Sequence, residues 1–441
     1  MVWSAAQFDM SRRSLLRSGA VLGAGALAGG LPFGQVAMAQ NTSGQWPRVA
    51  RLLSDFVASG RSPNAVVALG WGQNPPQYLG QGDTTFTSGL RANADSLYRI
   101  YSMTKPITGM AAIMLIDDGQ LSLDQPVAEI LPAFAEMKVQ KVYDGPITED
   151  NLEPAVRPIT IRHLLTHTAG LGYSIVQQGP LAQAYAENGL NPAQVSRLVD
   201  VPGGLNSPPA SSLEAFADGL ARMPLVYQPG THWSYSVGLD LMGRVIEVVS
   251  GKSFDAFLQE RIFDPCDMSS TWFRVPASEK ARLTANYFVL DGEPMPIDLP
   301  DSSVYLNQPA FPFGGAGLVS SPRDYDRFLM MLAGFGEIEG RRVMSEPAVR
   351  LATSNLFPDT LAPDGGFSSG GRAFGFGAAG LVGMGEAEGL FGWFGAAGTA
   401  GLVNMKAGLR QTFMTQYMPA DMEMQNAFPQ AVAADAAAMQ R

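Results

Sequence analysis

The stretch that decides the fold runs from Ser96 to Ile116 and reads SLYRIYSMTKPITGMAAIMLI. Residues 96–100 predict a strand, and residues 107–116 are apolar on nearly every face of a helix, followed by Asp118-Gly119 as a helix stop. A helix that is hydrophobic all round is buried in the protein. The stretch therefore predicts a strand that turns into a central, buried helix.

Ser102 and Lys105 stand in the turn between that strand and that helix, three residues apart. At this spacing two side chains share one helix face, with Cβ atoms roughly 5–6 Å apart. A half-buried ammonium is pushed toward the neutral amine, which can accept the proton of a serine hydroxyl. The helix N-terminus adds a positive dipole there, and Pro106 is tolerated in a first turn. The motif predicts a nucleophilic serine, but the motif alone is weak and needs partners.

Patterns on either side of this stretch predict the architecture. Helical spacing marks residues 49–57, and strand patterns mark residues 65–71, 78–80, 392–395, 401–405 and 412–417. Residues 121–309 predict short helices and long loops, and the Ala-rich tail 431–439 predicts a closing helix or a frayed end. We therefore expect an α/β (α+β) protein, with one antiparallel sheet built from both chain ends, flanked by helices, and an inserted, mainly helical lobe.

Partners for the Ser102 motif appear in three later segments. Residues 230–236 read GTHWSYS and precede a helix expected over 238–250, with Gly251 after it. A tyrosine at such a helix start, here Tyr235, can point its hydroxyl into a cleft, although most tyrosines serve packing. The other two segments are LLTHTAGL at 164–171 and WFGAAGT at 393–399.

In this order the four segments resemble the serine β-lactamase and penicillin-binding protein superfamily, whose S-x-x-K motif Ser102 and Lys105 match. The resemblance is greatest to its ester-cleaving branch, the family VIII carboxylesterases, which stand beside class C β-lactamases. It also covers 122–127, 314–318 and 321–325, and thus nearly the whole chain after residue 39. It implies a β-lactamase/DD-peptidase-like fold.

The resemblance also implies roles for individual residues. Ser102 matches the acylated nucleophile, and Lys105 matches its activating base. Tyr235 matches the tyrosine that passes a proton to the leaving group and later assists deacylation. The backbone N–H groups of Ser102 and Ala396 match the oxyanion hole.

Departures from the lactamase pattern bear on the substrate class. Class C enzymes carry Tyr-x-Asn and Lys-Thr-Gly, whereas this chain has Val237 in place of the asparagine and Trp393-Phe394-Gly395 in place of the second motif. Losing a charge-assisted hydrogen bond to an anionic substrate costs about 1.5–3 kcal/mol. We therefore expect Val237, Trp393, Phe394 and Gly395 to line a pocket for an uncharged ester, with Phe394 narrowing it, because the ester-cleaving branch usually has Trp-Gly-Gly.

Two other patterns suggest chemistry but do not support it. Residues 366–370 match G-x-S-x-G, yet Ser368 lacks the flanking strand and helix of a nucleophile elbow, and no histidine follows it. His163 and His167 are spaced i, i+4 on a predicted helix and could chelate a metal, but no third ligand offers itself. We expect Ser368 to lie in a glycine-rich loop and both histidines to be structural.

Composition narrows the function classes. The 441 residues include 40 acidic and 30 basic ones, a net charge of −10, so the chain lacks the positive surface of a nucleic-acid or anionic-membrane binder. A single cysteine, Cys266, forms no internal disulfide, and with three histidines a zinc site has few ligands. We expect no metal, no cofactor, no nucleic-acid partner and no membrane anchor.

The N-terminal residues predict an export signal. Arg12 and Arg13 precede an apolar stretch from Gly19 to Leu31 and an A-x-A-like cleavage site after Ala39. This pattern is typical of a twin-arginine export signal over 1–39, and the protein is then periplasmic or secreted. Residues 40–441 form one catalytic domain, with an α/β lobe of about 46–118 and 310–441 and a helical lobe of about 119–309.

The function that these observations favour is a carboxylesterase that cleaves small or medium esters through an acyl-enzyme on Ser102. One alternative is a β-lactamase or D-alanyl-D-alanine carboxypeptidase, and a second is a non-catalytic penicillin-binding-like protein. Neither the natural ester, its acyl-chain preference nor the oligomeric state follows from the sequence.

Overall fold

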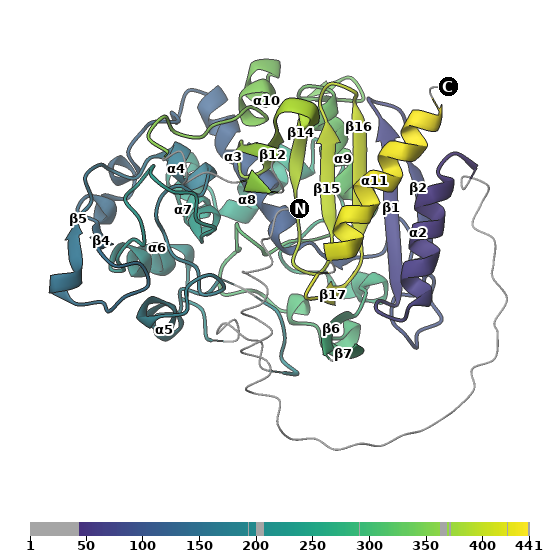
Figure 1. The fold of residues 1–441 in the computed structure, drawn as a ribbon, viewed down its shortest axis with the longest axis horizontal. Helices are drawn as coiled ribbons and strands as arrows, with labels where there is room; N and C mark the ends of the chain where they lie inside the picture. The colour runs from purple at the N-terminus through teal and green to yellow at the C-terminus, as the bar shows by residue number, and fades with distance from the viewer. Residues whose placement is uncertain are drawn as a thin grey trace.

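A computed structural model describes residues 44–192, 194–199, 207–290, 292–361, 368–369, 372–420 and 422–439. Its centre is an eight-stranded antiparallel sheet in the order β11-β12-β13-β14-β15-β16-β1-β2 (Figure 1). The strands of this sheet are β1 (Asn64–Trp71), β2 (Gln77–Gly82), β11 (Ser368–Ser369), β12 (Arg372–Phe376), β13 (Leu381–Gly383), β14 (Leu390–Phe394), β15 (Ala400–Asn404) and β16 (Leu409–Met414). Because β1 pairs with both β2 and β16, the two chain ends meet inside the sheet, which confirms the expected construction.

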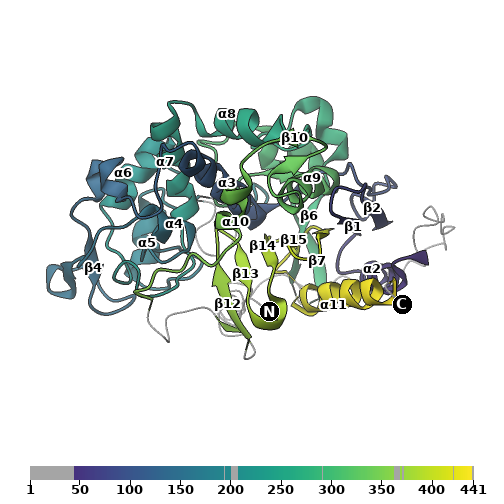
Figure 2. The ribbon, with the colours of Figure 1, turned by 90° about the horizontal axis from the view of Figure 1, so that it is seen from above.

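Helices cover both faces of this sheet (Figure 2). On one face, α2 (Pro47–Ala58) lies beside α11 (Met422–Met439), and on the other lies α9 (Pro322–Ala333). The strand β1 serves both faces, since Val67 packs against α2 and α11 while Val66 packs into the larger core on the opposite side. This alternation follows from the two-residue period of a strand.

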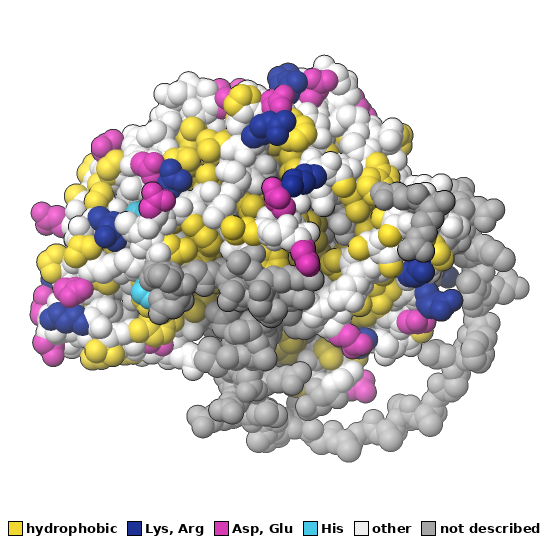
Figure 3. Space-filling view, turned by 45° about the horizontal axis from the view of Figure 1, so that its top comes forward, with side chains coloured by type: hydrophobic (Ala, Val, Ile, Leu, Met, Phe, Trp, Pro, Cys, Tyr) yellow, Lys and Arg dark blue, Asp and Glu magenta, His cyan; other side chains and the backbone are white. Residues whose placement is uncertain are grey.

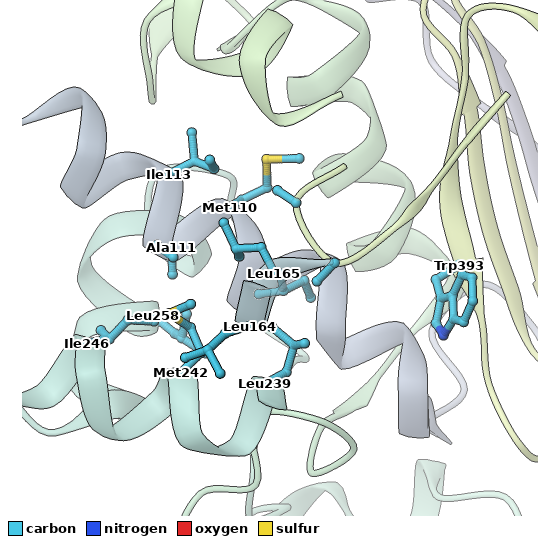
Figure 4. Close-up of a cluster of buried hydrophobic side chains, with 14 of the residues drawn as sticks. Met110, Ala111, Ile113, Leu164, Leu165, Leu239, Met242, Ile246, Leu258 and Trp393 are labelled. Carbon is cyan, nitrogen blue, oxygen red and sulfur yellow. The ribbon is translucent and has the colours of Figure 1, made fainter. Parts of the chain in front are cut away.

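The helix α3 (Thr104–Asp117) is the centre of the larger core. Every residue from Thr104 to Leu115 is buried, as the apolar sequence predicts. Its Met110, Ala111 and Ile113 lie close to side chains of α4 (Ile161–Leu165), α7 (Gly238–Ser250) and α8 (Phe254–Leu258) (Figure 4). Truncating Met110 or Ile113 to alanine would cost about 2–5 kcal/mol of stability.

Most of the remaining elements come from the part of the chain between β2 and β11. The other helices are α5 (Pro180–Glu187), α6 (Leu213–Ala221) and α10 (Glu346–Ala352). The other strands are β3 (Tyr98–Arg99), β4 (Lys138–Gln140), β5 (Leu152–Pro154), β6 (Asn286–Leu290), β7 (Glu293–Asp298), β8 (Val319–Ser320), β9 (Glu337–Ile338), β10 (Arg341–Arg342) and β17 (Tyr417–Met418). Helices α4 to α7 and strands β4 and β5 form the region to the left of the sheet in Figure 1.

Several elements differ in extent from the sequence-based expectations. The strand expected over 96–100 is reduced to the two residues of β3, because only these pair with β8. The central helix begins at Thr104 and includes Lys105 as expected, whereas Ser102 lies in the 3-10 turn just before it. The hairpin of β6 and β7 was not predicted within 121–309; it depends on the pairing of β6 with β17, about 130 residues later. The C-terminal tail is a helix, which begins earlier than 431.

The export signal expected over 1–39 lies outside the described residues and stays a prediction. No helix within the described ranges is both long enough and apolar enough to span a bilayer. On the face shown in Figure 3, basic and acidic side chains are interspersed, and neither charge sign forms a continuous patch.

Candidate active site

Ser102 lies in a single 3-10 turn, Tyr101–Met103, that joins β3 to α3. Tyr101, directly before the serine, has a left-handed backbone with φ of 42°. A non-glycine residue is strained there, and such strain persists only where the surroundings impose it. Two hydrogen bonds do so: Tyr325 Oη donates to Met103 O at 3.0 Å, and Asn286 Nδ2 donates to Tyr101 Oη at 2.9 Å. The turn that presents the serine is therefore fixed on both sides.

The Ser102 hydroxyl is contacted by the two predicted partners. Tyr235 Oη donates to Ser102 Oγ at 2.8 Å, and Lys105 Nζ lies 3.3 Å from the same oxygen. Lys105 and Tyr235 are each 1% exposed, whereas Ser102 is half-buried. The three side chains that the sequence assigns to catalysis thus meet at one oxygen atom, which can still be approached from outside.

Lys105 is held by the loop of residues 314–318, which reads GGAGL and is called the glycine loop below. Its Nζ donates to the carbonyl of Gly315 at 2.7 Å and lies 4.6 Å from the centre of the Tyr235 ring. The loop is attached to α3 by two further bonds, from Thr108 Oγ1 to Gly314 O at 2.7 Å and from the Leu318 N–H to Thr104 Oγ1 at 3.2 Å. The amine therefore has fixed partners besides the serine, which restricts it to one position.

Behind that loop lies Asp240, on the first turn of α7. Its Oδ1 accepts the Gly315 N–H at 2.9 Å, and a Cβ placed on Gly315 would come within 2.5 Å of its Oδ2. Only a glycine permits this approach. Burial raises the pKa of Asp240 to about 7, opposed by the positive charge of Lys105 and by the hydrogen bond from Gly315.

Tyr235 is enclosed by aromatic rings. The ring centres of His167, Tyr173 and Trp393 lie 4.7, 5.8 and 6.0 Å from its own. The Trp393 indole N–H also donates to Tyr235 Oη at 3.4 Å. Aromatic pairs at such separations contribute about 0.5–1.5 kcal/mol beyond their buried area. The position of the tyrosine hydroxyl is thus determined largely by ring packing.

The two histidines are not on one helix, so the expected i, i+4 geometry is wrong. The helix α4 ends at Leu165 because His167 adopts a left-handed backbone with φ of 55°. His163 closes the start of α4, where its Nδ1 accepts the Thr160 N–H at 3.2 Å. His167 Nδ1 lies 3.0 Å from Ser236 Oγ.

Both histidines have depressed pKa values. Burial lowers the pKa of His163 to about 4 and that of His167 well below its usual value, with nearby Lys105 adding to the effect on His167. His167 is therefore a neutral ring that packs against Tyr235. It lies within the site, although the sequence analysis did not include it among the site residues.

The proposed oxyanion hole lies where β14 ends. Gly395 donates its N–H to Thr399 O at 2.8 Å, and a Cβ on Gly395 would come within 2.5 Å of the carbonyl oxygen of Ile100. The turn after β14 is therefore packed directly against the segment that leads into Ser102. Ala396, the next residue, is exposed, and its N–H donates to no backbone carbonyl of the described residues. Its expected role in an oxyanion hole stays a prediction.

Two of the expected pocket residues are placed differently. Trp393, on β14 (Figure 4), has no exposed surface, and its ring lies against Tyr235 and Phe376. Val237 is also fully buried, and its N–H donates to Gly172 O at 3.3 Å. The expectation that both side chains line an accessible pocket is wrong. The Trp393 indole packs against the Tyr235 ring, and Val237 is buried at the N-cap of α7. Phe394 is half-buried, so its expected contact with substrate stays a prediction.

Ser368 is in the two-residue strand β11, which pairs with β12 at the edge of the sheet. A strand pair and not a loop therefore holds this residue. No helix follows β11 directly, since β12 does, and the context of a nucleophile elbow is absent, as the sequence predicts.

Sequence reasoning missed Asp240 and the place of His167 against the Tyr235 ring. An acidic residue in the otherwise apolar first half of α7 was a usable signal, because an unpaired carboxylate is rarely buried. No comparable signal marked His167, because the left-handed turn that ends α4 after Leu165 is not readable from the residues alone.

Comparisons with known proteins identify the family and agree with the fold. A family model described as Beta-lactamase matches residues 49–436. The esterase EstB of Burkholderia gladioli is 28% identical over 76% of this chain and 81% of its own. The structure titled EstCE1, a hydrolase with promiscuous acyltransferase activity, superposes with a TM-score of 0.69 at 23% identity, over 88% of this chain and 98% of its own. A family VIII carboxylesterase superposes with a TM-score of 0.64 at 18% identity, over 91% and 99%.

Proposed function

The chain belongs to the beta-lactamase family, and on that premise we propose that it is an exported carboxylesterase that works through an acyl-enzyme on Ser102. The observation that carries the proposal is the meeting of Lys105 Nζ and Tyr235 Oη at Ser102 Oγ, at 3.3 and 2.8 Å. A serine hydroxyl is a weak nucleophile until a positioned base removes its proton.

Acylation follows from these contacts. The neutral amine of Lys105 accepts the Ser102 proton as Oγ attacks the ester carbonyl carbon. The resulting oxyanion is stabilised by the N–H groups of Ser102 and Ala396. Tyr235 Oη gives its proton to the departing alkoxide, which leaves as an alcohol, and the Lys105 ammonium restores the proton to the tyrosine. Ser102 then carries the acyl group as an ester.

Deacylation repeats these steps with water as nucleophile. Water loses a proton to the Tyr235 and Lys105 pair and attacks the acyl carbon. The bond to Ser102 Oγ breaks, the acid is released, and the serine recovers its proton. The hydrogen bond from Trp393 to Tyr235 Oη stabilises the tyrosine oxygen whenever that oxygen gains negative charge.

Neutral esters are the favoured substrates. The position that holds a cation in class C enzymes is Trp393 here, and its buried indole offers no charge to a substrate carboxylate. The relative EstB, named as an esterase, supports the same substrate class. We therefore expect esters to be cleaved in preference to anionic β-lactams.

The test is a panel of p-nitrophenyl esters of increasing acyl length beside the chromogenic cephalosporin nitrocefin, with wild type and Ser102→Ala. We expect ester turnover well above nitrocefin turnover, and its loss in the variant, with Ser368→Ala as the control that keeps activity. Nitrocefin turnover equal to ester turnover would support the β-lactamase alternative. Absence of a covalent adduct on Ser102 after an organophosphate would support the non-catalytic one.

Acyl transfer to an alcohol is a second candidate, favoured by the similarity to the structure titled EstCE1, a hydrolase with promiscuous acyltransferase activity. Chemically it differs from hydrolysis only in that an alcohol replaces water in the deacylation step. Adding increasing concentrations of a primary alcohol to a p-nitrophenyl ester assay and quantifying both products separates the two. A transfer product that exceeds the acid at millimolar alcohol would establish the transferase.

Export rests on the N-terminal pattern alone. Cell fractionation of the full chain, compared with the double variant Arg12→Lys, Arg13→Lys, tests it. We expect the wild-type protein outside the cytoplasm and the double variant retained within it.

A further inference from the structure

Asp240 lies outside the set of residues to which the proposed mechanism assigns a step, yet it is joined to that set through one residue, Gly315. It is 1% exposed, and its carboxylate accepts the Gly315 N–H at 2.9 Å. The carbonyl of the same glycine accepts Lys105 Nζ at 2.7 Å. A continuous row of hydrogen bonds therefore leads from Asp240 through Gly315 and Lys105 to Ser102.

The row fixes the direction of the Gly315 carbonyl. A glycine has the widest choice of backbone conformations, so its carbonyl needs an external constraint to keep one orientation. The carboxylate supplies part of it, because it fixes the peptide plane before the Gly315 Cα, so that the direction of the carbonyl depends only on the two torsions of Gly315 itself. The neighbouring Gly314 approaches α7 as well, since a Cβ there would come within 2.4 Å of Leu239 O. The loop and the start of α7 are thus in direct contact.

Burying the Asp240 carboxylate costs desolvation free energy. A charged group retained at such a cost points to a role in the site. The charged and titratable groups that face Asp240 are Lys105 on α3 and Tyr173, and no cation pairs with the carboxylate at salt-bridge distance among the described residues. By contrast, buried Asp326 pairs with Arg410 at 3.0 Å. An apolar side chain at 240 would avoid the desolvation cost but would leave the Gly315 N–H without an acceptor.

We propose that Asp240 is a positioning residue for the reaction: by holding the Gly315 N–H it directs the Gly315 carbonyl at Lys105 and keeps the amine in reach of Ser102 Oγ. This inference rests on the proposed function, in which Lys105 is the base. It assigns to Asp240 no contact with substrate and no proton transfer.

The experiment compares Asp240→Ala with Asp240→Asn in the full chain. The amide oxygen of asparagine can still accept the Gly315 N–H, whereas alanine cannot. The readouts are kcat and KM for a p-nitrophenyl ester and the rate at which a fluorophosphonate labels Ser102. Asp324→Asn is the matched control, because Asp324 is a buried carboxylate that accepts a backbone N–H, that of Ser270 at 2.6 Å, outside the row.

We expect Asp240→Ala to lower kcat and the labelling rate by about 10–100-fold with KM nearly unchanged, since misplacement by about 1 Å costs up to about 10²-fold. Asp240→Asn should stay within about 3-fold of wild type, as should Asp324→Asn. Combined with Lys105→Ala, the change Asp240→Ala should lower the labelling rate no further, because its effect passes through the lysine.

Three results would overturn the inference. An Asp240→Ala protein that folds and labels at the wild-type rate removes any positioning role. Equal losses in Asp240→Ala and Asp240→Asn assign the effect to the negative charge and not to the hydrogen bond. Additive losses with Lys105→Ala place the effect elsewhere. Failure of the proposed function is distinguishable, because wild type would then show neither labelling of Ser102 nor ester turnover.

Discussion

The two sides of Ser102 are built in different ways. On the Lys105 side, hydrogen bonds fix each group: the amine to Gly315 O at 2.7 Å, and the Gly315 N–H to Asp240 at 2.9 Å. On the Tyr235 side, ring packing dominates, with His167 and Trp393 against the tyrosine and one long hydrogen bond of 3.4 Å from the indole.

The difference follows from what each group must do. A flexible lysine has four rotatable bonds and needs directional acceptors to hold its amine in one place. A tyrosine ring has two, and shape alone can fix it once its faces are covered. Substitutions on the polar side should therefore act through hydrogen-bond geometry, and those on the aromatic side through packing.

Removing the atom shared by both sides gives the largest effect. Ser102→Ala should lower kcat for esters by more than about 10⁴-fold, because no covalent intermediate can form. The substitution removes one half-buried hydroxyl, so the melting temperature should stay within a few degrees of wild type. Steady-state kinetics with calorimetry checks both, and activity near wild type would assign the nucleophile to another residue.

Substitutions at Lys105 and at Tyr235 test the two sides separately. Lys105→Ala and Tyr235→Phe should each lower kcat by about 10²–10⁴-fold, the range for losing a positioned acid or base. Lys105→Arg should not restore activity, since a guanidinium keeps its proton at working pH. Initial rates for the three variants decide the matter, and an active arginine variant would refute a neutral-amine base.

Trp393 distinguishes packing from hydrogen bonding on the aromatic side. Trp393→Phe keeps a ring but loses the N–H to Tyr235, and we expect kcat to fall by about 3–10-fold, in line with one modest hydrogen bond. Trp393→Lys puts an ammonium into a fully buried space and should instead reduce stability strongly. Melting temperatures and kcat/KM for a neutral ester and an anionic cephalosporin test both. A stable lysine variant with improved cephalosporin turnover would restore the pocket role that the sequence suggested for this position.

The contributions of the two sides to folding stability should change with pH in opposite directions. This is the smallest of the expected effects. The raised pKa of Asp240, about 7, means that the native state binds its proton more readily than the unfolded state. This side therefore gains stability as pH falls from about 7 toward 4. The depressed pKa of His167 means that the unfolded state binds the proton first, so the aromatic side loses stability as pH falls below about 6.5.

Thermal melts of Asp240→Asn and His167→Gln between pH 8 and 5 measure these contributions. As pH falls, the melting temperature of wild type relative to Asp240→Asn should rise by about 1–3 °C, and that relative to His167→Gln should fall by a similar amount. Parallel curves for wild type and both variants would show that neither group titrates as its burial implies.

Much of the site was accessible from the sequence. The spacing of Ser102 and Lys105 is local, and any chain that forms the predicted turn and helix brings the two side chains together. The helix 238–250 was predicted with its observed ends, because Gly251 supplies the left-handed residue that stops it. Tyr235 was found through its place before that helix together with the family resemblance.

The remainder depended on contacts between segments far apart in the chain. Asp240 meets Gly315 across 75 residues, and Trp393 meets Tyr235 across 158. Whether Trp393 faces solvent or the tyrosine is decided by how β14 lies against the segment that carries Tyr235, which no local pattern encodes.

The sequence by itself determined the closeness of Ser102 and Lys105, the antiparallel sheet built from both chain ends and the central buried helix, because these follow from short-range spacing and hydrophobic periodicity. Only the tertiary structure decided that Asp240 supports the glycine loop, that His167 lies outside α4, and that Trp393 and Val237 are buried. Those features arise where separate elements pack, and packing depends on the shapes of both partners at once.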